Sequence, residues 1–195
     1  NLNALIAARH NSGLGSDPNS VLLVSEDAHS SFIKCIRIMG LDEANLIRIK
    51  TDNNGSIDIQ NLRKTIDRCF IDNKKIFAIV ATLGTTVRGA IDPIKDISEI
   101  CKERNIWLHI DGSIGGIFAI TSIPIEGLNN INQANSITIN PQKIIGITKT
   151  SSLLLVSEMS TLENTFSTGL PYLSSNEDII NLSLIHISEP TRLRS

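Results

Sequence analysis

The sequence predicts an α/β fold in which a mostly parallel sheet is flanked by helices. Two observations carry this prediction. Short apolar runs alternate along the chain with amphipathic helical patterns, which is the order of elements in βαβ units. Several runs are apolar at consecutive positions, so both faces of those strands are expected to be buried, as in a parallel sheet covered by helices.

The individual elements follow from the spacing of apolar residues and from the turn-forming residues between them. The first ten residues read as part of a helix, with Leu2, Leu5 and Ile6 on one face. We expect strands at residues 21–26, 45–50, 76–82, 106–111, 136–140 and 151–157, and further helices around residues 30–40, 58–70 and 92–105.

Capping residues indicate where these helices begin and end. Gly40 is expected to end the second helix, because glycine readily takes the left-handed conformation found at helix C-termini. Asp58 is the expected N-cap of the third helix. In the fourth helix, Asp92 is the expected N-cap with Pro93 in the first turn, and the buried stripe is expected to contain Ile94, Ile97, Ile100 and Cys101.

The composition indicates a soluble globular chain and argues against several function classes. Of the 195 residues, 41% are hydrophobic and 19% are charged, which suits one domain with a core. The net charge of -2 gives no broad basic field, so we expect no nucleic-acid partner, and no apolar run suggests a membrane span. The cysteines form no CxxC pair, so we expect no metal site and reduced core cysteines in a cytoplasmic protein.

The two ends of the sequence suggest an incomplete protein. The chain starts inside a helical pattern and without methionine, so we expect an internal fragment. We find no linker within residues 1–181, which are expected to belong to one domain. Residues 182–195 change character abruptly and match the in-frame translation of a sequencing adapter, so we expect an artefactual tail there.

Polar side chains follow the carboxyl ends of several expected strands, which is where ligands bind in such sheets. His29 follows the first strand, Thr82 ends the third, and Asp111 ends the fourth, with Ser113 just after it. The segment after the fifth strand, NPQK, contains Asn140, Gln142 and Lys143. We therefore expect a shared site at this edge of the sheet.

Lys143 lies between an apolar strand and an Ile-Ile-Gly turn, and two interpretations are open. An amine in apolar surroundings loses solvation, which lowers its pKa and makes it a better nucleophile. The alternative is a lysine whose stem covers apolar surface while its charge reaches water. Because an imidazole, a carboxylate and hydroxyls share the expected edge, we favour a functional amine.

A lysine, a carboxylate and an imidazole together suit pyridoxal phosphate. The lysine can form a Schiff base with the cofactor aldehyde, and the carboxylate can pair with the pyridinium nitrogen so that the ring accepts electrons. The imidazole can stack on the ring, while small polar groups and backbone N–H donors hold the phosphate. The sequence has no GxGxxG, GxxxxGK[ST] or HExxH motif that points to another chemistry.

Four segments resemble, in order, the motifs of group II pyridoxal-phosphate-dependent amino-acid decarboxylases. They are DAHSSFIKC, ATLGTTVRGAIDP, WLHIDGSIGG and NPQK. The resemblance runs from Asn1 to about Asn181 and implies that this region is part of the large cofactor-binding domain of the type I pyridoxal-phosphate-dependent transferase fold, here incomplete. It also implies a homodimer for the full-length parent, with a small-molecule amino acid as substrate.

The resemblance assigns roles residue by residue. It implies that Lys143 holds the cofactor as a Schiff base, that Asp111 pairs with the pyridine nitrogen, and that His29 stacks on the ring and helps protonate the carbanion left by loss of CO2. The remaining implied cofactor contacts are Thr82 and Ser113 around the ring, and Asn140 and Gln142 near the phosphate. The activity implied is decarboxylation of an L-amino acid to the amine and CO2, with the present chain expected to be inactive alone.

Departures from the family pattern leave alternatives open. Gln142 stands where the family has histidine, and Gly112, Ser113 and Ile114 stand where it often has Ala, Ala and an aromatic residue. The alternatives are an aminotransferase or carbon–carbon lyase of the same fold, a non-catalytic degenerate homologue, and a nucleotide-binding doubly wound domain. Taken singly, His29 could cap a helix or be solvated, Asp111 could cap a helix, and TLGTT could be an ordinary turn.

Overall fold

The computed structural model describes residues 1–122, 125, 127–148 and 150–167. Its six strands form one sheet in the order β2-β1-β3-β4-β5-β6, in which the first five run parallel and β6 is antiparallel to β5. The mostly parallel sheet is therefore confirmed. The strands are β1 (Ser20–Ser25), β2 (Leu46–Ile49), β3 (Lys75–Thr82), β4 (Trp107–Asp111), β5 (Ser136–Ile139) and β6 (Leu153–Val156).

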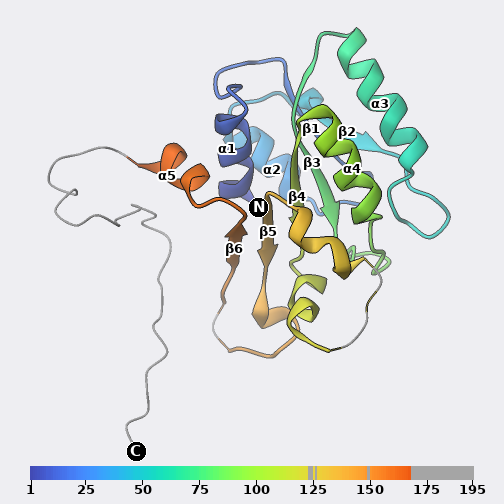
Figure 1. Cartoon of the computed structure of the whole chain (residues 1–195), viewed down its shortest axis with the longest axis vertical. Helices are drawn as coiled ribbons and strands as arrows, with labels where there is room; N and C mark the ends of the chain where they lie inside the picture. Colours follow the sequence, from blue (N-terminus) through green and yellow to red (C-terminus); the bar gives the residue numbers. More distant parts are fainter. Residues whose placement is uncertain (123–124, 126, 149, 168–195) are drawn as a thin grey trace, which may run out of the picture.

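Helices cover both faces of the sheet (Figure 1). The α-helices are α1 (Leu2–Asn11), α2 (Ser31–Ile38), α3 (Ile59–Ile71), α4 (Ile94–Arg104) and α5 (Ser160–Phe166). Short 3₁₀ turns are η1 (Glu43–Asn45), η2 (Gly115–Ile120), η3 (Leu128–Gln133) and η4 (Pro141–Lys143). The sequence did not predict α5 or the 3₁₀ turns.

Two apolar clusters lie on opposite faces of the sheet, because alternate residues of a strand point in opposite directions. Ile79 and Ala81 of β3 belong to the cluster that contains the buried residues of α3 and α4. Ala78 and Val80 belong to the cluster that contains Leu5, Phe32 and Ile36 from α1 and α2. The sheet thus has a helix layer on each side, as its apolar strands predict.

Two of the expected helix caps are confirmed. Gly40 follows the end of α2 with a φ of +71°, in the left-handed region. The side chain of Asp58 accepts a hydrogen bond from the backbone N–H of Asn61, in the first turn of α3. The expected residues of α4 (Ile94, Ile97, Ile100 and Cys101) are all buried.

The expectation that Asp92 caps α4 is wrong. The helix begins at Ile94 and Pro93 occupies the N-cap position, so Pro93 also lies one residue before the first turn. The carboxylate of Asp92 is buried and instead accepts hydrogen bonds from two other segments, the N–H of Ile57 at 2.8 Å and the N–H of Thr82 at 2.7 Å. A buried carboxylate needs such partners, and these two N–H groups satisfy both of its oxygens.

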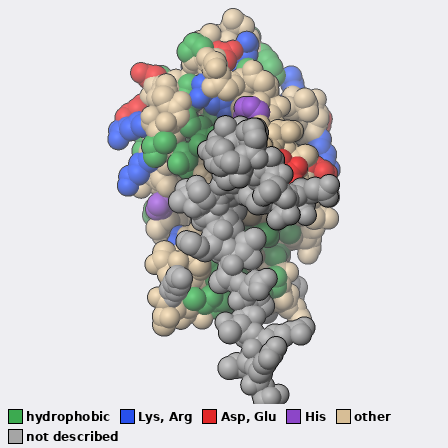
Figure 2. All heavy atoms as spheres, turned by 90° about the vertical axis from the view of Figure 1, so that its left-hand side faces the viewer, with side chains coloured by type: hydrophobic (Ala, Val, Ile, Leu, Met, Phe, Trp, Pro, Cys, Tyr) green, Lys and Arg blue, Asp and Glu red, His purple; other side chains and the backbone are tan. Residues whose placement is uncertain are grey.

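The surface is mixed in character, and the cysteines lie in the core. On the face shown in Figure 2, basic, acidic and apolar side chains lie side by side. Cys35, Cys69 and Cys101 are buried and free, as expected. Within the described residues, no helix has the length and apolar character needed to cross a membrane. The expected tail at residues 182–195 lies outside the described residues.

Candidate functional site

A small pocket at the carboxyl edge of the sheet brings together five of the seven expected site residues. The residues that line it are His29, Thr82, Gly84, Thr85, Thr86, Asp111, Ser113, Ile114 and Lys143. They come from the ends of β1, β3 and β4 and from the turn after β5. The convergence expected from the strand order therefore exists.

Asn140 and Gln142 do not line this pocket. The Oδ1 atom of Asn140 accepts a hydrogen bond from the Ser152 hydroxyl at 3.1 Å, and Oε1 of Gln142 accepts one from the Ser151 hydroxyl at 3.4 Å. Both side chains are thus engaged with the segment that leads into β6. Their expected contact with a cofactor phosphate stays a prediction.

Asp111 is a buried carboxylate with three hydrogen-bond donors. Its Oδ1 accepts from the backbone N–H of Ser113 at 3.1 Å and from the Ser113 hydroxyl at 2.6 Å, while its Oδ2 accepts from Nδ2 of Asn1 at 3.0 Å. Desolvation by burial acts to raise the pKa of Asp111, but the hydrogen bonds from the Ser113 hydroxyl, the Ser113 backbone and Asn1 lower it overall. The carboxylate is therefore anionic, and it caps no helix.

His29 is exposed and stands beside the start of α2. Its Nδ1 accepts a hydrogen bond from the backbone N–H of Ser31 at 3.2 Å. Because Ser31 is the first residue of α2, His29 accepts a hydrogen bond at the start of this helix, as the helix-capping alternative predicts. The same imidazole also lines the pocket, so the two interpretations of His29 are compatible.

Lys143 ends the 3₁₀ turn that follows β5, and its side chain is exposed. Its sequence neighbours Ile144 and Ile145 are exposed as well, so the apolar residues around Lys143 in the sequence do not bury its amine. The structure therefore differs from the desolvated lysine suggested by the sequence. The amine stands at the solvent-accessible rim of the pocket.

Two buried hydroxyls flank Asp111. Thr82 on β3 and Thr138 on β5 are both in register with Asp111 on β4, so the three side chains share one face of the sheet. Within the described residues, neither threonine hydroxyl has a hydrogen-bond partner. A buried hydroxyl without a partner costs free energy. Of the two threonines, Thr82 lines the pocket, so its hydroxyl is placed to meet a ligand there.

Several residues behind Asp111 were missed from the sequence. Asn1 donates a hydrogen bond to Asp111, and Nε2 of His109 lies 2.9 Å from Oδ1 of Asn1. On β5, Ser136 is in register with His109 and Thr138 is in register with Asp111. A signal existed in part, because WLHID and SITI place polar residues at alternate positions of strands that are otherwise apolar. The contribution of Asn1 could not be seen, since it depends on how α1 packs against the sheet.

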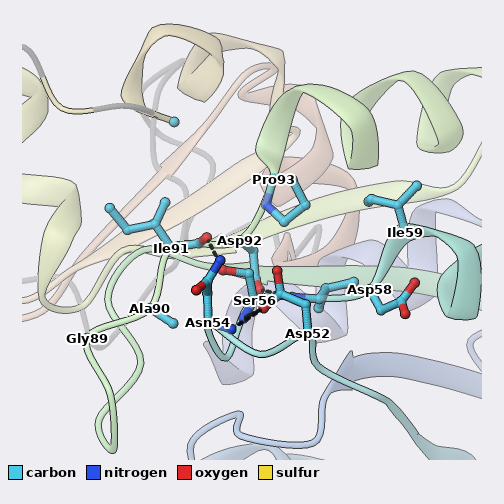
Figure 3. A pocket seen from close by; sticks show the side chains of 12 residues that line it. Asp52, Asn54, Ser56, Asp58, Ile59, Gly89, Ala90, Ile91, Asp92 and Pro93 are labelled. Atoms are coloured by element: carbon cyan, nitrogen blue, oxygen red, sulfur yellow. Dashed lines mark hydrogen bonds between the residues drawn. The ribbon is translucent and has the colours of Figure 1, made fainter.

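A second and larger cavity, of about 720 Å³, lies where the turn at residues 52–58 meets residues 89–93 (Figure 3). Asp52, Asp58 and Asp92 line it together with Asn54 and Ser56, and none of the expected site residues does. Among the described residues that line this cavity there is no lysine, arginine or histidine, and its carboxylates would repel a phosphate. Despite its size, it is the weaker candidate for a phosphate-bearing cofactor.

Comparison with known proteins identifies the family. The conserved domain of the pyridoxal-dependent decarboxylases matches residues 8–188. The chain belongs to this family. Pyridoxal phosphate is the cofactor of pyridoxal-dependent decarboxylases, and the fold of this chain is that of their type I cofactor-binding domain.

Relatives of this chain are named for different substrates and different products. The acidic amino acid decarboxylase of Xenopus tropicalis is 35% identical over 150 residues, which cover 77% of this chain and 29% of that protein. Tryptophan decarboxylase of Catharanthus roseus, solved with L-tryptophan, is 29% identical with a TM-score of 0.80, covering 86% of this chain and 37% of that one. The 4-hydroxyphenylacetaldehyde synthase of Rhodiola rosea is 26% identical with a TM-score of 0.77, covering 85% and 37%. The chain therefore spans about a third of the length of these relatives.

The side chains of the pocket fit the family's cofactor. Asp111 is anionic and can pair with a protonated ring nitrogen, Lys143 offers an amine, and the Thr82 hydroxyl is buried without a partner in the described chain. The pocket measures about 20 Å³, which suits a single water molecule. A pyridine ring would therefore have to occupy the open side as well, where His29 and Lys143 are exposed. Within the described residues, no group of His, Cys, Asp and Glu side chains could hold a metal ion.

Proposed function

We propose that the protein carrying this sequence is a pyridoxal-phosphate-dependent decarboxylase that converts an L-amino acid to its amine and CO2. The observation that supports this proposal is the pocket in which Lys143, Asp111 and His29 converge. These three residues come from distant parts of the sequence and are the ones to which the family resemblance gives catalytic roles. Because the chain spans about a third of its relatives, the proposal concerns the whole protein.

Each residue has a proposed task. Lys143 would hold the cofactor through its amine, and Asp111 would keep a proton on the ring nitrogen because it remains anionic. His29 would lie against the ring and hold a proton close to the reacting carbon. Thr82 and Ser113 would contact the ring substituents, and Asn140 and Gln142 would approach the phosphate. Bound pyridoxal phosphate would supply an electron sink for the electron pair left when CO2 departs.

The substrate is proposed only as an L-amino acid. The relatives include a decarboxylase named for acidic amino acids and one named for tryptophan, so family membership does not select the substrate's side chain. Ile114 lines the pocket where the family often has an aromatic residue. This aliphatic side chain is a proposed contributor to substrate choice.

A second candidate function keeps the cofactor and changes the reaction. The similarity to a 4-hydroxyphenylacetaldehyde synthase shows that the same fold occurs in a protein named for an aldehyde product. Product analysis separates the two candidates: an amine with CO2 supports the decarboxylase, whereas a carbonyl product supports the alternative. Homodimerisation and a cytoplasmic location are further proposals, the latter supported by the buried free cysteines.

The proposal is tested by chemical trapping of the cofactor. Full-length protein would be incubated with pyridoxal phosphate, reduced with borohydride and digested, and the labelled peptide identified by mass spectrometry. We expect the label on Lys143 and its loss in Lys143→Ala, while Lys64→Ala, which removes an exposed lysine of α3, leaves the label unchanged. A label on another lysine in the wild-type protein, or none, would contradict the proposal.

A further inference from the structure

A row of polar side chains lies behind Asp111 on the face of the sheet covered by α1. Trp107, His109 and Asp111 alternate along β4, so their side chains point to the same face. Ser136 on β5 is in register with His109, and Asn1 stands at the start of α1. His109 is 0% exposed and Ser136 is 1% exposed, so the middle of this row is closed off from water, while Trp107 and Asn1 at its sides are partly buried.

Consecutive hydrogen bonds connect the row. Nε1 of Trp107 donates to the hydroxyl of Ser136 at 2.8 Å, and the same hydroxyl is 2.8 Å from Nδ1 of His109. Nε2 of His109 is 2.9 Å from Oδ1 of Asn1. Nδ2 of Asn1 then donates to Oδ2 of Asp111 at 3.0 Å.

The two ends of the row, together with a neutral His109, fix the direction of every bond between them. An indole N–H can only donate, and an ionised carboxylate can only accept. Since Nδ2 of Asn1 donates to Asp111, it is Oδ1 of Asn1 that faces His109, and Nε2 of His109 must donate to it. Nδ1 of His109 is then an acceptor and receives the proton of the Ser136 hydroxyl, which accepts from Trp107.

This arrangement requires a neutral imidazole. A protonated His109 would carry a hydrogen on Nδ1 and leave the Ser136 hydroxyl proton without an acceptor in a closed environment. Burial is the largest effect on the pKa of His109 and lowers it, while the Asp111 carboxylate and a backbone group of Ser136 act in the opposite direction. His109 is therefore neutral, with its proton on Nε2.

We propose that Trp107, Ser136, His109 and Asn1 form a directed hydrogen-bond chain that fixes the orientation of Asp111. The chain holds Oδ2 through Asn1, while Ser113 holds Oδ1 from the other side. Ser136, His109 and Asn1 are positioning residues, because they act on the cofactor only through the carboxylate. The role toward the cofactor rests on the proposed function, whereas the tautomer of His109 does not.

The tautomer is tested without any cofactor. Full-length protein labelled with ¹⁵N-histidine would be followed by NMR from pH 5 to 8, with the His109 signals assigned by their absence in His109→Gln. We expect a neutral imidazole protonated at Nε2 that does not titrate in this range. A His109 that gains a proton in this range, or whose proton resides on Nδ1, would overturn the directed chain.

The positioning role is tested by cofactor affinity and absorption. In Ser136→Ala, the chain is broken two bonds from Asp111, and we expect pyridoxal phosphate to bind about tenfold more weakly with a shifted absorption band. His109→Gln, whose amide can still donate to Asn1, is expected to bind more tightly than His109→Phe. Ser98→Ala is the matched control, since it removes a buried hydroxyl bonded to Lys95 on the other side of the sheet and should leave the affinity unchanged.

The outcomes separate the two proposals. If the wild-type protein fails to bind pyridoxal phosphate, the proposed function fails, and the NMR result still decides the state of His109. If the wild-type protein binds and Ser136→Ala and His109→Phe bind equally well with an unchanged band, the positioning role is refuted. Circular dichroism of each variant shows that an altered affinity does not arise from unfolding.

Discussion

Two buried aspartates at the carboxyl edge of the sheet have opposite electrostatic environments. Burial acts to raise the pKa of Asp111, but the hydrogen bonds from Ser113 and Asn1 lower it overall. Burial raises the pKa of Asp92 to about 6; hydrogen bonds from two backbone N–H groups oppose this, while Asp52 and Asp27 contribute in the same direction as burial. Asp111 is thus suited to pair with a cationic ring, and Asp92 is suited to tie two backbone segments together.

The raised pKa of Asp92 predicts a pH dependence of stability. A carboxyl whose pKa is higher in the folded than in the unfolded state stabilises the fold fully below its unfolded pKa, near 4, and loses that contribution as the pH rises through about 6. The shift corresponds to about 3 kcal/mol. Urea unfolding at pH 4, 5, 6 and 7 should show this loss in the wild-type protein and not in Asp92→Asn.

The pKa of Glu26 is shifted in the direction opposite to that of Asp92, so Glu26 serves as a control. The backbone N–H of Thr51 and the side chains of Lys50 and Thr51 lower the pKa of Glu26 to about 2. Its contribution is present above pH 4.5 and is lost as the pH falls toward 2. Glu26→Gln should therefore lower the free energy of unfolding above pH 4.5 and remove the loss that the wild-type protein shows toward pH 2, while the pH dependence between pH 5 and 7 stays unchanged. Equal pH profiles for the wild-type protein and Asp92→Asn would contradict the environment described for Asp92.

The hydroxyl of Thr138 predicts a gain in stability on substitution. Thr138 is buried, and its hydroxyl has no hydrogen-bond partner within the described residues. Valine has nearly the same shape without the polar group, so Thr138→Val should raise the free energy of unfolding by about 1 kcal/mol. Thermal unfolding checks this. Thr51→Val is the control: its hydroxyl donates to Glu26, and its loss should destabilise the protein.

At the level of elements, the sequence predicted the strands and the four longer helices to within a few residues. Consecutive apolar residues define strands such as β3, and the cap at Asp58 is a local signal. The antiparallel direction of β6 and the true role of Asp92 were not predictable in this way, because both depend on which segments become neighbours. An Asp-Pro pair before a helix is typical of an N-cap, so the local sequence indicated that Asp92 caps α4. In the folded chain the Asp92 carboxylate is buried and accepts hydrogen bonds from the N–H groups of Ile57 and Thr82 instead.

The N-cap of α3 predicts how substitutions of Asp58 change the stability of the fold. The side chain of Asp58 accepts the N–H of Asn61 at 3.0 Å, which would otherwise be unsatisfied in the first turn. Asp58→Ala should lower the free energy of unfolding by about 1 kcal/mol, measured by urea titration. Asp58→Ser, which retains a hydroxyl acceptor, should recover most of the loss. Equal destabilisation by both substitutions would show that the cap contributes little.

At the scale of the molecule, the topology accounts for how much of the site was predictable. Residues that follow parallel strands meet at one edge, so the convergence of His29, Thr82, Asp111 and Lys143 could be expected from the strand order. The partnership of His109 with Asn1 could not, because these residues are 108 positions apart and meet only through the packing of α1. The sequence also did not predict that Lys143 is exposed, since apolar neighbours in the sequence do not show whether a side chain is buried.

The segment after Lys143 and the edge strand β6 expose several large apolar side chains, with 43–56% exposure at Ile144, Ile145, Ile147, Leu153, Leu155 and Met159. Exposed apolar side chains that lie close together bind hydrophobic dyes. We predict that the 195-residue chain enhances the fluorescence of anilinonaphthalene sulfonate and that the full-length protein does so less.

The double substitution Leu153→Thr and Leu155→Thr should reduce this dye signal about twofold, because it removes two of the largest exposed side chains from β6 while threonine retains a high strand propensity. Ile71→Thr is the matched control: Ile71 is more exposed still but lies at the end of α3, away from β6. A dye signal that responds equally to both changes would indicate binding over the whole surface. A signal that responds only at β6 would locate the incompletely covered edge of the domain, next to the turn that carries Lys143.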